Sequence, residues 1–87
     1  MSIVATFNSD SGNTWWSILF YHENGRGYRV GPAVNSFREV ISTIPSLKEL
    51  WPHLDNKLYC DYGTTVNYEL IDMTDDLAVI TAILKYS

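Results

Sequence analysis

The chain has 87 residues, of which 46% are hydrophobic and 18% are charged, and its formal net charge is −4. This length supports one hydrophobic core, so we expect a single domain over residues 1–87, and the composition excludes disordered, collagen-like and coiled-coil chains. Only six basic residues are present, scattered along the sequence, which argues against direct nucleic-acid binding because that needs clustered Lys and Arg.

Two features favour a cytoplasmic protein without membrane contact. The apolar stretch within residues 1–7 is too short for a signal peptide, and no run of 18 apolar residues exists. Cys60 is the single cysteine, whereas secreted domains of this size are often held together by several disulfides. We therefore expect a reducing, cytoplasmic environment.

The first third of the sequence predicts a three-stranded meander. Residues 3–7 alternate apolar and small side chains, and the polar residues 8–13 form a turn. Residues 14–23 are the strongest predicted strand because they are rich in aromatic and β-branched side chains. Asn24-Gly25 predicts a type I′ hairpin turn into a third strand over residues 27–30.

The middle of the sequence predicts one main helix. Ser36 and Glu39 match a capping box, in which each side chain bonds the other residue's backbone N–H. An apolar stripe at i, i+3, i+4 and i+7 follows, made of Phe37, Val40, Ile41 and Ile44. Pro45 is expected to end this helix, and a second capping pattern predicts a short helical turn over residues 46–51 that covers the core.

The last third predicts further strands. We expect a strand over residues 57–62, a turn or bulge at Gly63 and a second strand over residues 64–73. Residues 77–86 fit either a helix capped by Thr74 or a strand. We choose the strand, because Asp75-Asp76 supplies a close reversal that would pair this segment with the preceding one.

These elements define the fold class as α+β. We expect an antiparallel sheet of five to six strands, in the sequence order β-β-β-α-β-β-β, packed on one main helix and a short helical turn. Side chains alternate along a strand, so Trp15, Leu19 and Tyr21 share the face of residues 14–23 that lies opposite Trp16 and Phe20. Both faces are therefore apolar, and one of them is either covered by the rest of the chain or binds a partner.

The sequence contains no pattern typical of catalysis or of a cofactor site. His22, His53 and Cys60 are ligand-capable, but none of the usual metal-site spacings is present, and we expect neither a metal nor a cofactor. A nucleophile and base pair of Cys60 with a histidine stays possible in sequence terms, although a buried structural cysteine is the commoner case. We expect that the protein is not an enzyme.

One charge feature stands out between residues 55 and 76, where six acidic residues face the single base Lys57. Such a run is usually the solvated side of a sheet, and the alternative is an acidic patch that docks on a basic groove. The predicted partner-binding surface combines the aromatic face with five of these acidic residues: Asp61, Glu69, Asp72, Asp75 and Asp76.

No motif identifies a family, but the overall profile is similar to a functional class. A small, acidic, Trp- and Tyr-rich domain without catalytic residues resembles stoichiometric inhibitors such as bacterial immunity proteins and phage anti-defence proteins of the anti-CRISPR type. This resemblance implies an inhibitor that occludes a basic, nucleic-acid-binding site on a target enzyme. The alternative is an assembly module that forms a homodimer through the aromatic sheet face.

Overall fold

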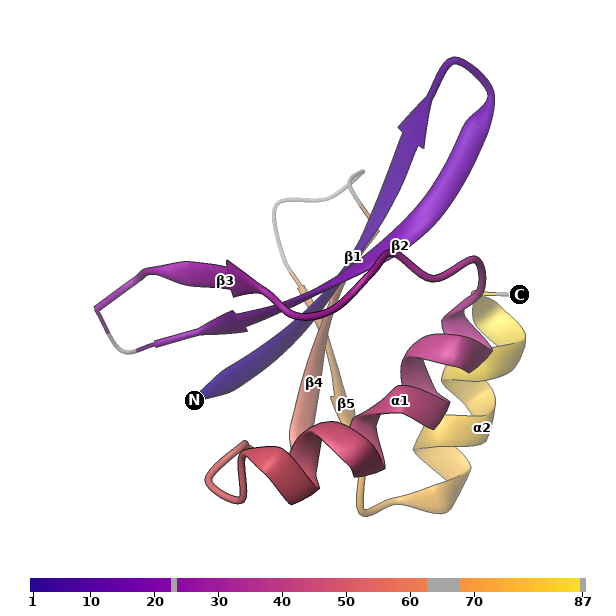
Figure 1. Ribbon diagram of the computed structural model, residues 1–87. Helices are drawn as coiled ribbons and strands as arrows, with labels where there is room; N and C mark the ends of the chain where they lie inside the picture. Colours follow the sequence, from indigo (N-terminus) through magenta and orange to yellow (C-terminus); the bar gives the residue numbers. More distant parts are fainter. Residues whose placement is uncertain (23, 63–67, 87) are drawn as a thin grey trace.

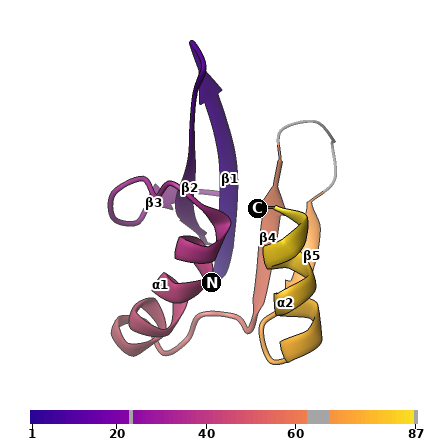
Figure 2. The same ribbon diagram turned by 90° about the vertical axis from the view of Figure 1, so that its right-hand side faces the viewer.

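The computed structural model describes residues 1–22, 24–62 and 68–86, and in this part of the chain two helices lie on one side of a five-stranded sheet (Figure 1, Figure 2). The strands follow the order β3-β2-β1-β4-β5 across the sheet. Along the chain the elements are β1 (Ser2–Asp10), β2 (Asn13–Tyr21), β3 (Gly27–Arg29), α1 (Phe37–Leu50), β4 (Lys57–Asp61), β5 (Glu69–Asp72) and α2 (Asp76–Lys85).

The predicted meander is present, but the type I′ turn lies at a different place. Ser11 and Gly12 both have positive φ, 50° and 85°, and join Asp10 to its partner Asn13 as a two-residue type I′ turn requires. At the second reversal Gly25 has positive φ and Tyr21 pairs with Gly27, whereas a two-residue turn at Asn24-Gly25 would pair Tyr21 with Tyr28. The type I′ prediction at Asn24-Gly25 was therefore wrong, although the chain does reverse there.

The sheet is mixed, which corrects the prediction of a purely antiparallel one. β1 pairs with β2 antiparallel and with β4 parallel. The cause is the connection through α1, which crosses one face of the sheet and returns the chain to the end at which β1 began (Figure 1). A parallel neighbour requires such a long crossover, whereas hairpins alone give antiparallel neighbours.

Helix α1 begins as predicted and ends later than predicted. The Ser36 and Glu39 capping box is formed on both sides, but the helix continues through Pro45 to Leu50. Proline inside a helix costs about 3 kcal/mol. Ile44 and Leu47 are both buried, and burying each side chain contributes roughly 1.5–3 kcal/mol, so the apolar stripe outweighs the proline. The separate short helical turn over residues 46–51 is therefore not present.

The last segment is a helix, α2, so the prediction of a strand over residues 77–86 was wrong. Its N-cap is Asp75, whose carboxylate accepts hydrogen bonds from the backbone N–H groups of Leu77 and Ala78. Asp76 in the first turn and Lys85 in the last turn have the signs that favour the helix macrodipole. Strand β5 is correspondingly short, and the predicted turn at Gly63 and residues 64–67 of the predicted strand lie outside the described residues.

An aromatic cluster holds both helices to the same face of the sheet. Trp16 of β2 is buried, and its ring centroid lies 5.1 Å from that of Phe37 in α1 and 5.7 Å from that of Tyr86 at the end of α2. Phe7 and Tyr62 stack at 4.7 Å beside it. The rest of the core is mainly aliphatic, apart from Phe20 and Cys60, and comes chiefly from β1, β2, β4, β5 and both helices.

The Asp75 cap gives a direct test of the C-terminal helix. Asp75→Ala removes both cap hydrogen bonds and should lower the free energy of unfolding by about 1 kcal/mol (range about 0.5–2), whereas Asp75→Asn should change it little. Urea denaturation followed by circular dichroism measures both. Asp76→Ala is the control for loss of a neighbouring charge, and equal effects of Asp75→Ala and Asp76→Ala would contradict the capped helix.

Candidate functional surface

The face of the sheet opposite the helices, here called the open face, carries an apolar row that crosses every described strand. The strand register aligns one residue from each strand in the order of the sheet: Arg29, Leu19, Val4, Tyr59 and Leu70. Four of these five side chains are apolar or aromatic. Only the β3 end of the row is charged.

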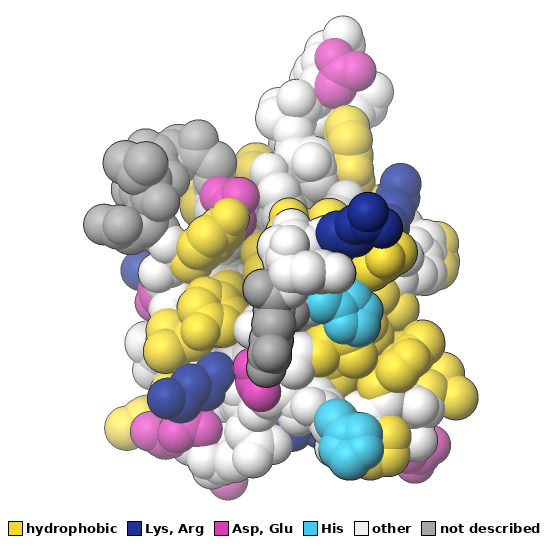
Figure 3. Space-filling view, turned by 90° about the vertical axis from the view of Figure 1, so that its left-hand side faces the viewer, with side chains coloured by type: hydrophobic (Ala, Val, Ile, Leu, Met, Phe, Trp, Pro, Cys, Tyr) yellow, Lys and Arg dark blue, Asp and Glu magenta, His cyan; other side chains and the backbone are white. Residues whose placement is uncertain are grey.

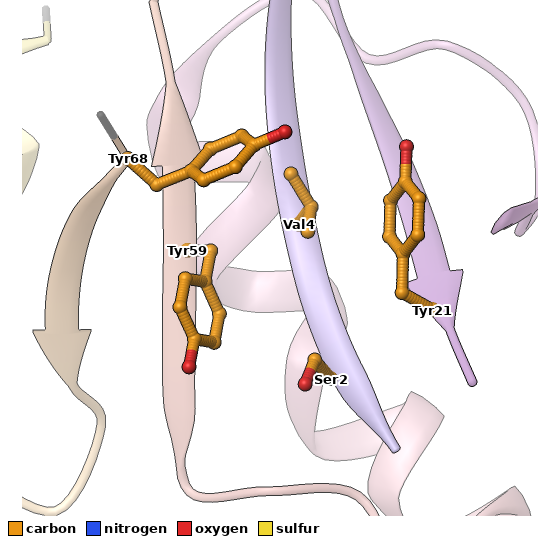
Figure 4. A pocket seen from close by; sticks show the side chains of 5 residues that line it. All are labelled: Ser2, Val4, Tyr21, Tyr59 and Tyr68. Atoms are coloured by element: carbon orange, nitrogen blue, oxygen red, sulfur yellow. The ribbon is translucent and has the colours of Figure 1, made fainter. Parts of the chain in front are cut away.

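Tyrosine side chains surround the centre of this row. Val4 is only 6% exposed, although it lies outside the core under the helices. Figure 4 shows Tyr59 and Tyr21 on either side of Val4, with the ring of Tyr68, the residue before β5, reaching toward it. The rings of Tyr59 and Tyr68 are perpendicular, with centroids 6.2 Å apart. Together with Ser2 these residues line a shallow hollow of about 190 Å³.

The three aromatic-face residues predicted from the sequence all lie on the open face by register. Leu19 and Tyr21 are half-buried beside the tyrosine-lined hollow, and Trp15 is half-buried farther along β2. Tyr21 also covers Gly27, where an added Cβ would lie 2.8 Å from the tyrosine ring, so a larger residue at position 27 would require this ring to move. The described part of the chain encloses none of these three side chains.

Other residues of the open face were missed by the sequence analysis, chiefly Tyr59, Tyr68 and Leu70. The signal that could have found Tyr59 is the alternation of residues 57–61, in which Leu58 and Cys60 are the apolar partners of the other face. Figure 3 shows the molecule from the side opposite to that of Figure 2. Hydrophobic side chains form exposed areas on both the left and the right of this view.

The predicted acidic residues do not form one patch. Asp72 pairs with Lys57 at the beginning of β4, and Asp61 lies at the end of that strand, four residues or about 13 Å away. Asp72, Asp75 and Asp76 do lie together at the turn from β5 into α2, here called the acidic corner. The Thr74 hydroxyl and backbone N–H donate to Asp72 and lower the pKa of its carboxyl group.

Glu69 belongs to the other side of the sheet. Lys85 donates a hydrogen bond of 2.8 Å to its carboxylate, and the Tyr86 hydroxyl donates a second one. Both hydrogen bonds lower the pKa of Glu69, and the one from Lys85 has the larger effect. Glu69 therefore attaches the end of α2 to β5 and is not part of the surface that the sequence analysis assigned to it.

Cys60 is buried beside the same contact. Burial raises the pKa of its thiol to about 11, and the Tyr86 hydroxyl opposes this shift in part. Burial and the Glu69 hydrogen bond likewise raise the pKa of Tyr86 above its usual range. A thiol with this pKa is protonated at neutral pH, and the thiolate is the nucleophilic form. The Cys60 environment thus favours the structural interpretation of this residue.

The two histidines differ from Cys60 in their surroundings. Both are exposed, and the ring of His22 meets that of Tyr28 edge to face at 5.4 Å. His22 borders a second hollow of about 450 Å³, whose apolar walls include Phe20, Val30 and Trp51. Among the described residues, no group of three or more His, Cys, Asp or Glu side chains is arranged to hold a metal ion.

Comparison with protein-family models, with curated proteins and with solved structures gives no match to this chain. Across the described residues, neither helix has the length and apolar content needed to cross a membrane. The open face and the acidic corner are therefore interpreted from their own geometry.

The Glu69 contact predicts a specific pH dependence of stability. The pKa of the Glu69 carboxyl group is lowered in the native protein. The contact therefore contributes its full stabilisation above the unfolded pKa of about 4.3, and this stabilisation is lost as the pH falls through the native pKa. Glu69→Gln should therefore be less stable than the wild type at pH 7, and this difference should shrink below about pH 4. Urea denaturation at a series of pH values measures it.

Glu49→Gln is the matched control, since Glu49 is exposed on α1. Its stability should follow the wild-type curve across the same pH range. A difference between Glu69→Gln and wild type that stays constant with pH would contradict the proposed role of the Glu69 charge.

Proposed function

We propose that this protein is a non-catalytic binding module that docks on a partner protein through the open face. The observation that carries the proposal is the apolar row from Leu19 to Leu70, which crosses the sheet on the side that neither helix covers. An antiparallel or mixed sheet with one covered face normally presents polar side chains on the other face. Here the uncovered face is apolar at its centre.

The chemistry of the open face suits protein recognition. Tyr and Trp are enriched among interface residues that dominate binding energy, because they bury a large rigid ring and keep a polar group for hydrogen bonding. Tyr21 in β2 and Tyr59 in β4 lie on either side of Val4 (Figure 4), and Tyr68 directly precedes β5. Binding a partner would cost little entropy for ordering Tyr21 and Tyr59, since strands fix their backbone.

The charge of the molecule favours a partner with a basic surface. The net charge is −4, and the acidic corner lies at the β5 end of the open face. Asp72 and Asp75 already accept hydrogen bonds from the chain, and Asp76 is exposed beside them. A negative edge beside an apolar centre would speed association with a basic site and then occupy it.

The mechanism we propose is occlusion, in which the protein covers a nucleic-acid-binding site of a target enzyme, as an immunity protein or an anti-CRISPR-like inhibitor does. The buried, free Cys60 agrees with action in the reducing cytoplasm. The alternative is that a second copy of the chain occupies the open face. Arg29 lies at one edge of the open face, and Asp61 and Asp72 lie toward the other edge. If two copies packed open face to open face across a two-fold axis, Arg29 of each copy would lie near these acidic residues of the other copy, which favours this alternative.

A matched pair of tyrosine variants tests the docking surface. Tyr68 on the open face is 51% exposed, and Tyr28 on the helix side of β3 is 50% exposed. Tyr68→Lys places a cation in the interface and should weaken binding roughly tenfold or more, whereas Tyr28→Lys should leave it within about twofold. Quantitative affinity capture from the native host, followed by mass spectrometry and titration of the purified partner, measures both.

The outcome that contradicts the proposal is a partner that both variants bind as the wild type does, or that Tyr28→Lys loses and Tyr68→Lys keeps. Thermal unfolding of each variant shows whether it is folded. Tyr68→Lys could instead change the sedimentation of the purified protein without changing partner binding. This result would favour the alternative, a homodimer through the open face, over the inhibitor.

A pair of charge-neutralising variants tests the electrostatic part. Asp72→Asn with Asp76→Asn removes two charges from the acidic corner and retains hydrogen-bond acceptors, and Asp10→Asn with Glu49→Gln removes two charges elsewhere. The first pair should lower the association rate with the captured partner several-fold at low salt. Stopped-flow or surface plasmon resonance measures the rates, and equal rates for the two pairs would rule out steering by the acidic corner.

A further inference from the structure

Helix α2 is apolar on its outer face as well as on its inner face. Leu77, Ile80 and Leu84 are 73%, 55% and 71% exposed, while Ala82 on the opposite face is buried against the core. A helix that is apolar all round is normally covered on all sides, and contiguous exposed apolar groups usually mark an interaction site. No part of the described chain covers this stripe (Figure 2).

The spacing of the stripe matches a helix–helix seam. Steps of three and four residues separate Leu77, Ile80 and Leu84, which is the a/d spacing of helices that pack side by side. Leu77 and Leu84 lie at equal distances along the sequence from a point between Ile80 and Thr81, and Thr81 is the mirror position of Ile80. Two copies of α2 that run antiparallel through this point would place Leu77 of each copy against Leu84 of the other.

We infer that a second copy of this chain covers the outer face of α2, with the two helices antiparallel across a two-fold axis. The contact is isologous, because each position meets its mirror position on the partner copy. It uses a surface different from the open face, so it goes beyond the proposed function and leaves the open face of each copy available.

The charges at the helix ends select the antiparallel direction. Asp76 lies in the first turn and Lys85 in the last turn, at equal distances along the sequence from the centre of the seam. An antiparallel pair brings Asp76 of one copy to Lys85 of the other at both ends, whereas a parallel pair would align like charges. Lys85 already binds Glu69, but its side chain is 58% exposed and has further donors. Antiparallel helix dipoles also attract.

The size of the seam sets the strength of the dimer. The ten residues of α2 span roughly 15 Å, and one short helix crossing buries less than the about 800 Å² per partner of a standard stable interface. A hollow of about 350 Å³ between β5 and α2, lined in part by Leu77, Ala78 and Thr81, adjoins the seam. We therefore expect reversible association with a dissociation constant in the micromolar range.

Sedimentation equilibrium of the full chain from about 5 to about 500 µM tests the inference. The wild type should pass from monomer to dimer within this range. Leu77→Glu and Leu84→Lys should each raise the dissociation constant roughly tenfold or more, because each puts two like charges into the seam. Both substitutions suit the helix dipole at their end of α2, so the monomers should remain folded, as circular dichroism will show.

Mixing the two variants tests the antiparallel register itself. In a mixed dimer the introduced carboxylate meets the introduced ammonium group at one end, and the two original leucines meet at the other. An equimolar mixture should recover most of the association that each variant lost. Leu50→Glu is the control, since Leu50 is 70% exposed at the end of α1, and it should dimerise as the wild type does.

A wild-type protein that stays monomeric to about 500 µM overturns the inference, and so does a Leu50→Glu variant that loses association as Leu77→Glu does. A mixture that stays monomeric overturns the antiparallel pairing. Tyr68→Lys should leave this association unchanged, and a dimer lost only in Tyr68→Lys assigns self-association to the open face. Partner binding by a strictly monomeric wild type would leave the proposed function standing without this dimer.

Discussion

The structure depends on the packing of both helices around Trp16. Its ring meets Phe37 of α1 and Tyr86 after α2, so one side chain in the sheet fixes two helices that are far apart in sequence. Burying about 200 Å² of aromatic surface contributes on the order of 5 kcal/mol, a large fraction of the stability of a small domain. Because both helices lie over Trp16, neither of them covers the opposite side of the sheet (Figure 1, Figure 2).

This arrangement gives the molecule two uncovered apolar surfaces of different kinds. The open face is a rigid, tyrosine-rich sheet surface with a charged group at its β3 edge, and the outer face of α2 is a narrow aliphatic stripe. The acidic corner lies between them and also forms the cap of α2 through Asp75. Asp72 and Asp75, which the sequence analysis assigned to a partner, therefore have a structural role in the turn and in the helix cap.

The sequence predicted the elements whose signals are local. Residues 14–23 predicted a strand with two apolar faces because alternation places Trp15, Leu19 and Tyr21 together, and the capping box at Ser36 marked the beginning of α1. The open face was found in part for this reason. Tyr59 was missed because its strand is short. Its neighbours on the open face come from β1 and β5, and the sequence does not show that these strands lie beside β4.

The remaining features depend on tertiary contacts. The β-branched residues of α2 favour a strand, and they form a helix because Asp75 caps it and Ala82 packs closely on the core. Pro45 is a helix breaker by local preference, yet buried Ile44 and Leu47 on either side hold the helix across it. The parallel pairing of β1 with β4 follows from the path of the α1 connection, which no short sequence pattern encodes.

The claim that the sheet is covered on one face only is tested most directly by methyl NMR with a soluble paramagnetic agent, on dilute protein. Leu70 and Ile71 are neighbours on β5, and they point to opposite faces of the sheet, with Ile71 buried under the helices. The account predicts strong broadening of the Leu70 methyl signals and little broadening of those of Ile71. Equal protection of both residues would contradict it, since the open face would then be covered within a single chain.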